Sequence, residues 1–576
     1  MRSEDWSQDW KHRIRRSDLI SVSLIGAVLA AICAPIAASG WVLTDDHQII
    51  ENSHAKPLHP QLEGRLGPLD YFIDVSQPRG RFEPLDYTLR YAVTRLVGAR
   101  FFALHAAMFF VGWVTLLCLF TASRIAGLFP SKALLIPLLT LLAPDAFSIW
   151  YRLGTAETWG TLFLSLALVC CFAAVRSGRL FWDLAMLTTS VAAALSKESF
   201  ALVLPALAIL RWWLVRTAPT WWSSQTKAQI VEPGTLRRGR RVVSGLLISF
   251  GLISVVVLVT VLRASSGSEG GMALRASGSG ALKFAFYGVA AVAFLGGGWL
   301  PVLAVILSKG RQGLVEWVRK DNLAVPVIFL LAWLVPQYAV YVSRGGPLGR
   351  FALPSAIGIA MAMTGAIVYV SSRGPRIART VCAAWLIGWA TVAGLHIVKT
   401  VSAARADGAA LKQMLVELSR DLPQNRPIAI LTEPSDQEGA MALIALLGYY
   451  GRPDVPIYYI RAHATHQNVP LGGEWLVHIE EALHQGLITN WFAKHQIGDL
   501  EDPNQLSAII LRVPSSELPP QLAGTIHSGS WIERQWCEPM LTGSVLSGRI
   551  LTRERICYRA LVLAQNSEGL GWGSDE

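Results

Sequence analysis

Long apolar stretches recur along the chain up to residue 398, and they limit its fold more than any other feature. Most are roughly 17 to 25 residues long, the length that a helix needs to cross a lipid bilayer. Hydrophobic residues make up 52% of the 576 residues and charged residues only 16%, more apolar surface than a soluble core of this size buries. The stretches lie at residues 18–42, 101–121, 132–148, 157–175, 180–196, 200–217, 243–262, 283–308, 323–342, 351–371 and 380–398. We therefore expect an all-α polytopic membrane domain with about eleven transmembrane helices.

The stretch at 180–196 gives the weakest of these predictions, because it is short and carries Asp183. Together with 200–217 it is also compatible with a re-entrant hairpin. In both arrangements the turn between the two segments lies on the same side of the membrane.

Basic residues indicate which side of the membrane each loop faces. The first apolar stretch follows the basic residues Lys11, Arg13, Arg15 and Arg16. It lacks an A-x-A-like cleavage site and is too long for a signal peptide, so we expect a retained helix with the N-terminus inside. Alternation then places the loops 43–100, 149–156, 196–199, 263–282 and 343–350 outside, with everything after 398. Most basic loop residues become cytoplasmic, as the positive-inside rule requires. The net charge of +11 is dispersed among short loops, so we expect no nucleic-acid partner.

The chain divides into a basic cytoplasmic tail (1–16), the membrane domain (17–398) and a soluble extracytoplasmic domain (399–576). In the last part, 427–431 and 455–460 are typical of buried strands, and 437–450 is typical of a helix. This order favours an α/β domain. Further strands are expected at 506–513 and 556–563.

Two cysteines lie in aqueous segments, Cys537 and Cys557, and both fall in the domain assigned to the oxidising side. They are candidates for a disulfide bond. Spacing alone cannot establish a bridge, so two unrelated buried thiols are an equally good interpretation.

An acidic pair, Asp45 and Asp46, follows the first helix where it leaves the bilayer on the outer side. Adjacent carboxylates repel each other, which raises the proton affinity of one of them and suits a general base in a shielded site. Taken alone, the pair is better explained as a solvated helix cap.

Two further motifs belong to the same outer face. Arg81 offers a fixed fork of donors for phosphate oxygens, and the aromatic residues near it suit a helix lying on the membrane surface. Contact with lipid headgroups is the simpler explanation for such an arginine. Glu157 is suited to bind an acceptor or to orient an arginine, and a simple ion pair with Arg152 is about as compatible.

The remaining two outer motifs are basic. Lys197, in a charged turn, can neutralise a phosphate as a point charge. Arg344 and Arg350 lie at the outer end of a span, against the positive-inside trend. An anionic ligand carrying phosphate groups in the outer leaflet would account for them.

The order of these motifs resembles the GT-C class of membrane glycosyltransferases, which use polyprenyl-phosphate-linked sugars and include the protein O-mannosyltransferases. The resemblance covers roughly residues 15–360. It rests on Asp45-Asp46 with Ile50 and Asn52, Gly80-Arg81-Phe82 with Pro84-Leu85, Arg152 with Gly154 and Glu157, Ser196-Lys197-Glu198, and Arg350-Phe351 with Leu353-Pro354. Glu83 interrupts the second motif. The tetratricopeptide repeats of the similar mannosyltransferase branch are absent, and the soluble domain has no match there, so the acceptor is not carried over.

The resemblance implies an inverting transfer, in which a carboxylate takes the proton of an acceptor hydroxyl as the hydroxyl attacks the anomeric carbon of a lipid-phosphate sugar. Asp45 is the expected base, and Asp46 is the alternative base or orients the loop. Glu157 is assigned to acceptor binding or loop organisation. Stabilisation of the leaving phosphate is assigned to Arg81, Lys197, Arg344 and Arg350.

We expect a bacterial inner-membrane protein of the cell envelope, and the alternation of spans puts its active site and C-terminal domain on the outer, periplasmic side. The expected partners are a polyprenyl-phosphate sugar, membrane lipids, and a glycan, lipid or protein acceptor. No cofactor is required. His47 beside two carboxylates leaves room for a divalent metal, which is not favoured.

Three other functions stay open. A transporter or flippase would use the same arginines to guide an anionic lipid, although no matching pair of broken helices marks a midplane site. An oligosaccharide ligase or polymerase would have a similar topology. A non-catalytic assembly or sensor protein would act through the soluble domain.

Overall fold

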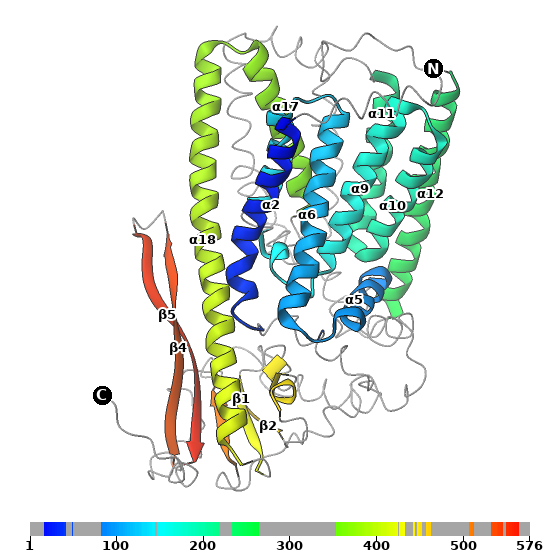
Figure 1. The fold of residues 1–576 in the computed structure, drawn as a ribbon. Helices are drawn as coiled ribbons and strands as arrows, with labels where there is room; N and C mark the ends of the chain where they lie inside the picture. The colour runs from blue at the N-terminus through cyan, green and yellow to red at the C-terminus, as the bar shows by residue number, and fades with distance from the viewer. Residues whose placement is uncertain are drawn as a thin grey trace, which may run out of the picture.

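The computed structural model is mostly helical in the part of the chain that it describes, with a β-sheet at one end of a helical bundle (Figure 1). The described residues are 16–41, 49, 82–143, 147–217, 233–263, 353–423, 426–432, 442–443, 446–451, 457–461, 506–511, 531–544 and 549–563. The apolar stretches expected at 283–308 and 323–342 lie outside these ranges.

Apolar helices form the bundle. They are α2 (Arg16–Ala37), α6 (Phe101–Ile125), α9 (Ala156–Ser177), α10 (Leu180–Ser196), α11 (Val203–Thr217), α12 (Pro233–Arg263), α17 (Leu353–Arg373) and α18 (Arg376–Asp421). Within the described ranges, five helices are long and apolar enough to cross a membrane: α2, α6, α9, residues 239–257 of α12, and α18. The expectation of a helical membrane domain is therefore met, although its expected number of spans is not tested over the whole chain.

The stretch expected as a single span at 132–148 is instead broken into short pieces. It forms α7 (Pro130–Ala133), α8 (Leu135–Leu141) and the 3-10 turn η3 (Phe147–Trp150). Prolines explain the difference, because Pro137 lies inside α8 and the residue before Pro144 is disfavoured in a helical conformation. With 7 residues α8 is too short to cross a bilayer, and it lies buried inside the bundle.

The pair α10 and α11 is joined by the 3-10 turn η4 (Glu198–Leu202). Asp183 near the start of α10 and Arg211 in the middle of α11 form a buried ion pair, with Arg211 Nη2 and Asp183 Oδ1 2.7 Å apart. This pairing explains how an apolar helix carries Asp183.

One continuous helix, α18, links the bundle to the sheet. It has 46 residues and continues 23 residues beyond 398, across the boundary expected between the membrane and soluble domains. Its last turns bury Met414, Leu415 and Leu418 in the same hydrophobic cluster as the strands. The sheet domain is therefore built partly on the end of a long apolar helix.

The sheet has five strands in the order β2-β1-β3-β5-β4. The strands are β1 (Ile428–Thr432), β2 (Ile457–Arg461), β3 (Ala508–Leu511), β4 (Trp531–Ser544) and β5 (Arg549–Leu563). β1 is parallel to both β2 and β3, and the described residues between β1 and β2 are helical at 442–443 and 446–449. This is the βαβ arrangement expected from the sequence. β5 is antiparallel to β3 and β4, and β4 was not expected.

The end of α2 packs directly against α18 and the sheet unit. A Cβ atom added to Gly408 would lie 2.9 Å from the carbonyl oxygen of Gly40, so the two backbones touch at this point. The ring of Trp41 contacts Phe101 and Tyr449 edge to face, and Tyr449 Oη donates a hydrogen bond of 3.0 Å to the carbonyl oxygen of Ala99. These contacts hold the sheet unit against the helical bundle.

Candidate functional site

A short helix, α5 (Pro84–Val97), lies at the end of the bundle that carries the sheet, where α9 begins and α10 ends (Figure 1). Pro84 occupies its first turn, where a missing N–H costs nothing, and Glu83 is the residue before it. With 14 residues α5 is too short to span a bilayer. An interfacial helix in this region was expected from its aromatic residues.

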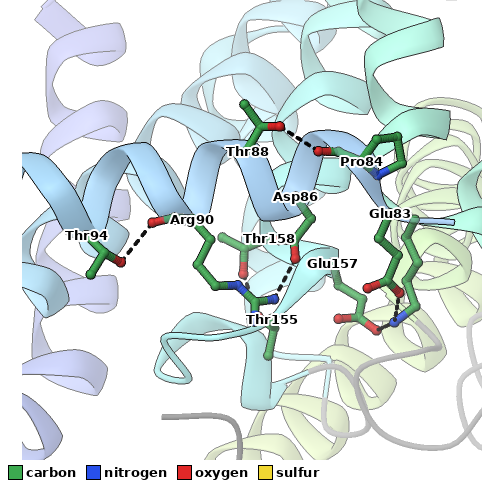
Figure 2. A network of polar contacts seen from close by, with 10 residues as sticks. Glu83, Pro84, Asp86, Thr88, Arg90, Thr94, Thr155, Glu157 and Thr158 are labelled. Carbon is green, nitrogen blue, oxygen red and sulfur yellow. Dashed lines mark hydrogen bonds and ion pairs between the residues drawn. The ribbon is translucent and has the colours of Figure 1, made fainter. Parts of the chain in front are cut away.

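The buried face of α5 is polar. Asp86, Arg90 and Thr94 follow one another at intervals of four residues, which places them on one side of the helix, and all three are buried (Figure 2). Arg90 also lies over the ring of Tyr87, with its Cζ 5.4 Å from the ring centroid. A helix that only covered a hydrophobic core would bury apolar residues here.

Glu157 enters the site from the first turn of α9. Thr155 precedes this helix with an extended backbone, and its Oγ1 lies 2.7 Å from Oγ1 of Thr158. The N-terminus of a helix carries a partial positive charge, which favours a carboxylate in the first turn. Glu157 is 1% exposed, so the bundle fully encloses this carboxylate.

Lys197 enters from the turn after α10. That helix ends at Ser196, and Lys197 has an extended backbone that turns its side chain toward α9. Its Nζ lies 2.6 Å from Glu157 Oε1 and 3.6 Å from Glu83 Oε1. Three segments that are far apart in the sequence thus meet at one buried ammonium group.

Asp86 and Arg90 form a second ion pair beside the first. Arg90 Nη2 donates to Asp86 Oδ2 at 2.5 Å. Within the described part of the chain, the other oxygen, Asp86 Oδ1, is buried with no hydrogen-bond partner. Such an oxygen is stabilised by carrying a proton or by meeting a ligand.

The electrostatics of this region depend on burial. Burial raises the pKa of Asp86 from 3.8 to about 7. The neighbouring cations Arg90 and Lys197 lower this pKa, and the neighbouring carboxylates Glu83 and Glu157 raise it. Three carboxyl groups and two cations are enclosed together, and the group is electrically neutral when Asp86 is protonated. We call these five residues, Glu83, Asp86, Arg90, Glu157 and Lys197, the buried charge cluster.

The structure brings together two of the residues predicted as site residues, Glu157 and Lys197. The Lys197 ammonium faces two carboxylates, so its charge is already compensated. Asp45, Asp46, Arg81, Arg344 and Arg350 lie outside the described residues and stay predictions, as does His47. Among the described residues, no group of three or more His, Cys, Asp or Glu side chains is placed to hold a metal ion.

Three members of the cluster were not assigned a role from the sequence. Glu83 interrupts a motif and looked like a departure from it, yet it contacts Lys197. Asp86 and Arg90 are spaced four residues apart, a signal for a helical ion pair. That spacing gives no indication of whether the pair is buried or solvated.

The sheet domain contains a covalent link. Cys537 on β4 and Cys557 on β5 lie directly opposite each other in the antiparallel register and are joined by a disulfide bond. The five other cysteines, all in apolar helices, are free. The bond lies in the part of the chain that the topology assigns to the oxidising side.

These features define the class of protein: a mostly helical membrane protein with a polar site and a mixed sheet at one end of its bundle. No family model matches the chain, and no curated protein matches it. Among solved structures it is similar to the crystal structure of ArnT from Cupriavidus metallidurans bound to undecaprenyl phosphate, with 12% sequence identity and a TM-score of 0.44, over 93% of this chain and 97% of that one. A likeness of this degree does not define a family, so the function is argued from the site.

Proposed function

We propose that the chain is a GT-C-type inverting glycosyltransferase that moves a sugar from a polyprenyl-phosphate donor to an acceptor hydroxyl on the non-cytoplasmic face of the membrane. One observation carries the proposal. Glu83, Glu157 and Lys197 come from three separate motifs of the sequence pattern, and they converge on one buried point at the same end of the bundle as the disulfide-containing sheet (Figure 1).

The proposed chemistry is a single displacement. The carboxylate of Asp45 takes the proton from the acceptor hydroxyl, and the freed oxygen forms a bond to the anomeric carbon from the face opposite the phosphate. The bond between that carbon and the phosphate oxygen breaks, and its electron pair stays on the lipid phosphate. The sugar is a hexose or a pentose, and the acceptor is a glycan, a lipid or a protein.

The buried charge cluster refines the proposed roles. Because Lys197 is held by two carboxylates, it supports Glu157 in its position and shares its charge with a phosphate only in part. The phosphate charge then falls mainly to Arg81, Arg344 and Arg350. Glu157 keeps its proposed role of binding the acceptor or organising the outer loop, and Asp46 that of orienting this loop.

The test is transfer by purified protein supplied with polyprenyl-phosphate sugars. Asp45→Asn is expected to abolish transfer while leaving the thermal unfolding temperature unchanged, and Asp46→Asn to reduce transfer. Glu533→Gln, which neutralises an exposed carboxylate on β4, serves as the matched control and should retain activity. Full turnover by Asp45→Asn would remove Asp45 from the role of base.

Mass spectrometry of envelope glycans from a deletion strain would identify the donor and the acceptor together. The sugar that is missing identifies the donor, and the molecule that lacks it identifies the acceptor. Movement of an unaltered lipid-linked sugar across the membrane, with no transfer, would point to the transporter alternative.

A further inference from the structure

The two long strands β4 and β5 form a ribbon that runs beside α18 and points back toward the bundle (Figure 1). Three contacts follow this course. Trp536 Nε1 donates to Glu417 Oε2 at 2.7 Å, Tyr558 Oη donates to Asp407 Oδ1 at 2.6 Å, and the backbone N–H of Leu541 donates to Ser402 Oγ at 2.9 Å. As β4 advances from 536 to 541, its partners on α18 move from 417 to 402, toward the membrane.

The expected end of the last span at residue 398 places Ser402 at the level of the outer membrane interface. Ser402 follows residue 398 by four residues, or about 6 Å of helix. The headgroup layer of a bilayer extends about 5 to 7 Å beyond the hydrocarbon on each side. Leu541, bound to Ser402, therefore lies among the headgroups.

A second marker, independent of the hydropathy pattern, places the ribbon near the same end of the bundle. Gly408 touches Gly40, which lies three residues beyond the end of α2. Ser402 is about 9 Å nearer the membrane than Gly408 along α18. The ribbon at Leu541 is therefore level with the last turns of α2, an apolar helix long enough to span.

The pairing register of β4 and β5 shows which residues at this end of the ribbon lie on the face opposite to Trp536 and Tyr558. Trp536 and Tyr558 are paired and contact α18, so residues an even number of positions away share their face. Arg553 pairs with Leu541 and Arg555 pairs with Pro539, which puts both arginines on the opposite face. Both are exposed, and they lie about 6 to 7 Å apart.

The charge on this outward face is concentrated near the membrane. Glu533 belongs to the same face at the far end of the ribbon, where its Oε1 lies 3.5 Å from Arg559 Nη1. The acidic residue of the membrane-proximal end, Glu554, pairs with Met540 on the other face of the ribbon and is itself exposed. Arg553 and Arg555 are thus two exposed cations at headgroup level.

We propose that the membrane-proximal end of the ribbon, residues 539–542 and 552–555, docks on the outer leaflet and that Arg553 and Arg555 bind the phosphates of anionic phospholipids. Arginine presents a planar fork of donors that matches phosphate oxygens. A two-stranded ribbon is marginally stable by itself, so α18 on one face and lipid on the other both support it. The inference does not depend on the proposed reaction.

The position of the ribbon is tested in nanodiscs with a bimane label at Leu541→Cys. Quenching by lipids brominated on their acyl chains is expected for this label, with little quenching by aqueous iodide. A label at Gln535→Cys, on the same face but farther from the membrane, should show the reverse. The unsubstituted protein gives the background from native cysteines. Iodide quenching of both labels, without bromine quenching, would overturn the docking.

The lipid preference is tested by native mass spectrometry of protein from mixed phosphatidylcholine and phosphatidylglycerol nanodiscs. The double variant Arg553→Gln with Arg555→Gln is expected to lose bound phosphatidylglycerol, by roughly fivefold for each arginine. Arg420→Gln, which removes an exposed arginine about 27 Å farther along α18, should retain it. Equal retention by the double variant and the control would contradict the assignment of these arginines. Sugar transfer is not measured in either experiment, so failure here leaves the proposed reaction standing.

Discussion

Asp86 combines complete burial with a pKa near neutrality. Burial raises this pKa to about 7, and the charged groups around it are Arg90, Glu83, Lys197 and Glu157. Between about pH 4 and pH 7 the folded protein then binds a proton that the unfolded chain has released. We expect the contribution of Asp86 to the free energy of unfolding to be fully present at acidic pH and to be lost as the pH rises through about 7. Asp86→Asn, which is neutral throughout, should lack this component, seen as a smaller change of unfolding temperature between pH 5 and pH 8.

A control separates this effect from general pH sensitivity. Glu533→Gln neutralises an exposed carboxyl group of the sheet domain and should follow the pH profile of the unchanged protein. Parallel profiles for Asp86→Asn and the unchanged protein would contradict a raised pKa at Asp86.

Lys197 is expected to stabilise the fold as well as the site. Lys197→Met leaves the buried carboxylate of Glu157 without its cation, a change that costs about 3 to 5 kcal/mol in buried pairs. Adding Glu157→Gln removes that negative charge and should restore much of the loss. Thermal unfolding of the single and double variants measures both effects. A double variant no more stable than Lys197→Met would show that the pair is not coupled.

Among single residues, the sequence singled out Glu157 and Lys197, because both belong to motifs that follow a recognisable order along the chain. Glu157 and Lys197 could be placed on one face because the alternation of spans put both on the outer side. Asp86 and Arg90 could not be assigned to the site, because an ion pair between residues four apart occurs on the solvated face of a helix as readily as on its buried face. Only the packing of α5 on α9 and α10 shows that this face is buried.

Among the elements, the contact between α2 and α18 depends on glycine. A methyl group at Gly408 would lie 2.9 Å from the carbonyl oxygen of Gly40. Backbone atoms cannot move aside as easily as the end of a side chain. Gly408→Ala is expected to destabilise the protein by about 1 to 3 kcal/mol, as overpacking does. Gly394→Ala, on the same helix with open space around it, should be neutral or slightly stabilising because alanine favours helix. Thermal unfolding of the two variants distinguishes them, and equal stability would exclude a close contact at Gly408.

The elements that the sequence missed share a physical cause. β4 contains Pro539 among charged residues, which argues against a central strand. The structure makes β4 an edge strand, where proline is tolerated. The stretch 132–148 was misjudged because hydropathy registers apolar content and takes no account of its prolines. The end of α18 was missed because its outer half is polar on one face and buried on the other.

For the whole molecule, the disulfide offers a test of orientation. A membrane-impermeant reductant is expected to open the Cys537–Cys557 bond in right-side-out vesicles and to leave it intact in inside-out vesicles, read as a gel shift with a maleimide polymer. A cysteine at Arg179, expected inside, should show the opposite accessibility. Reduction only in inside-out vesicles would reverse the topology. Opening a loop of this length should also cost the outer domain about 3 kcal/mol of stability.

The helical bundle followed from the sequence because hydropathy depends on the membrane itself, whereas the sidedness inferred from loop charge stays a prediction. The alternation of strand and helix in the outer domain was also readable. How the outer domain meets the bundle was not, since it depends on contacts such as Trp41 with Tyr449 between residues distant in the chain. The acidic pair Asp45-Asp46 stays a prediction from motif order.

The unbroken course of α18 has a mechanical consequence. The sheet domain has no separate linker to the bundle at this point, because the helix that enters it is the same one that packs in the bundle. A tilt of the sheet domain is therefore expected to tilt α18 as well. A ligand that moves the sheet domain would change the packing of α18 within the bundle.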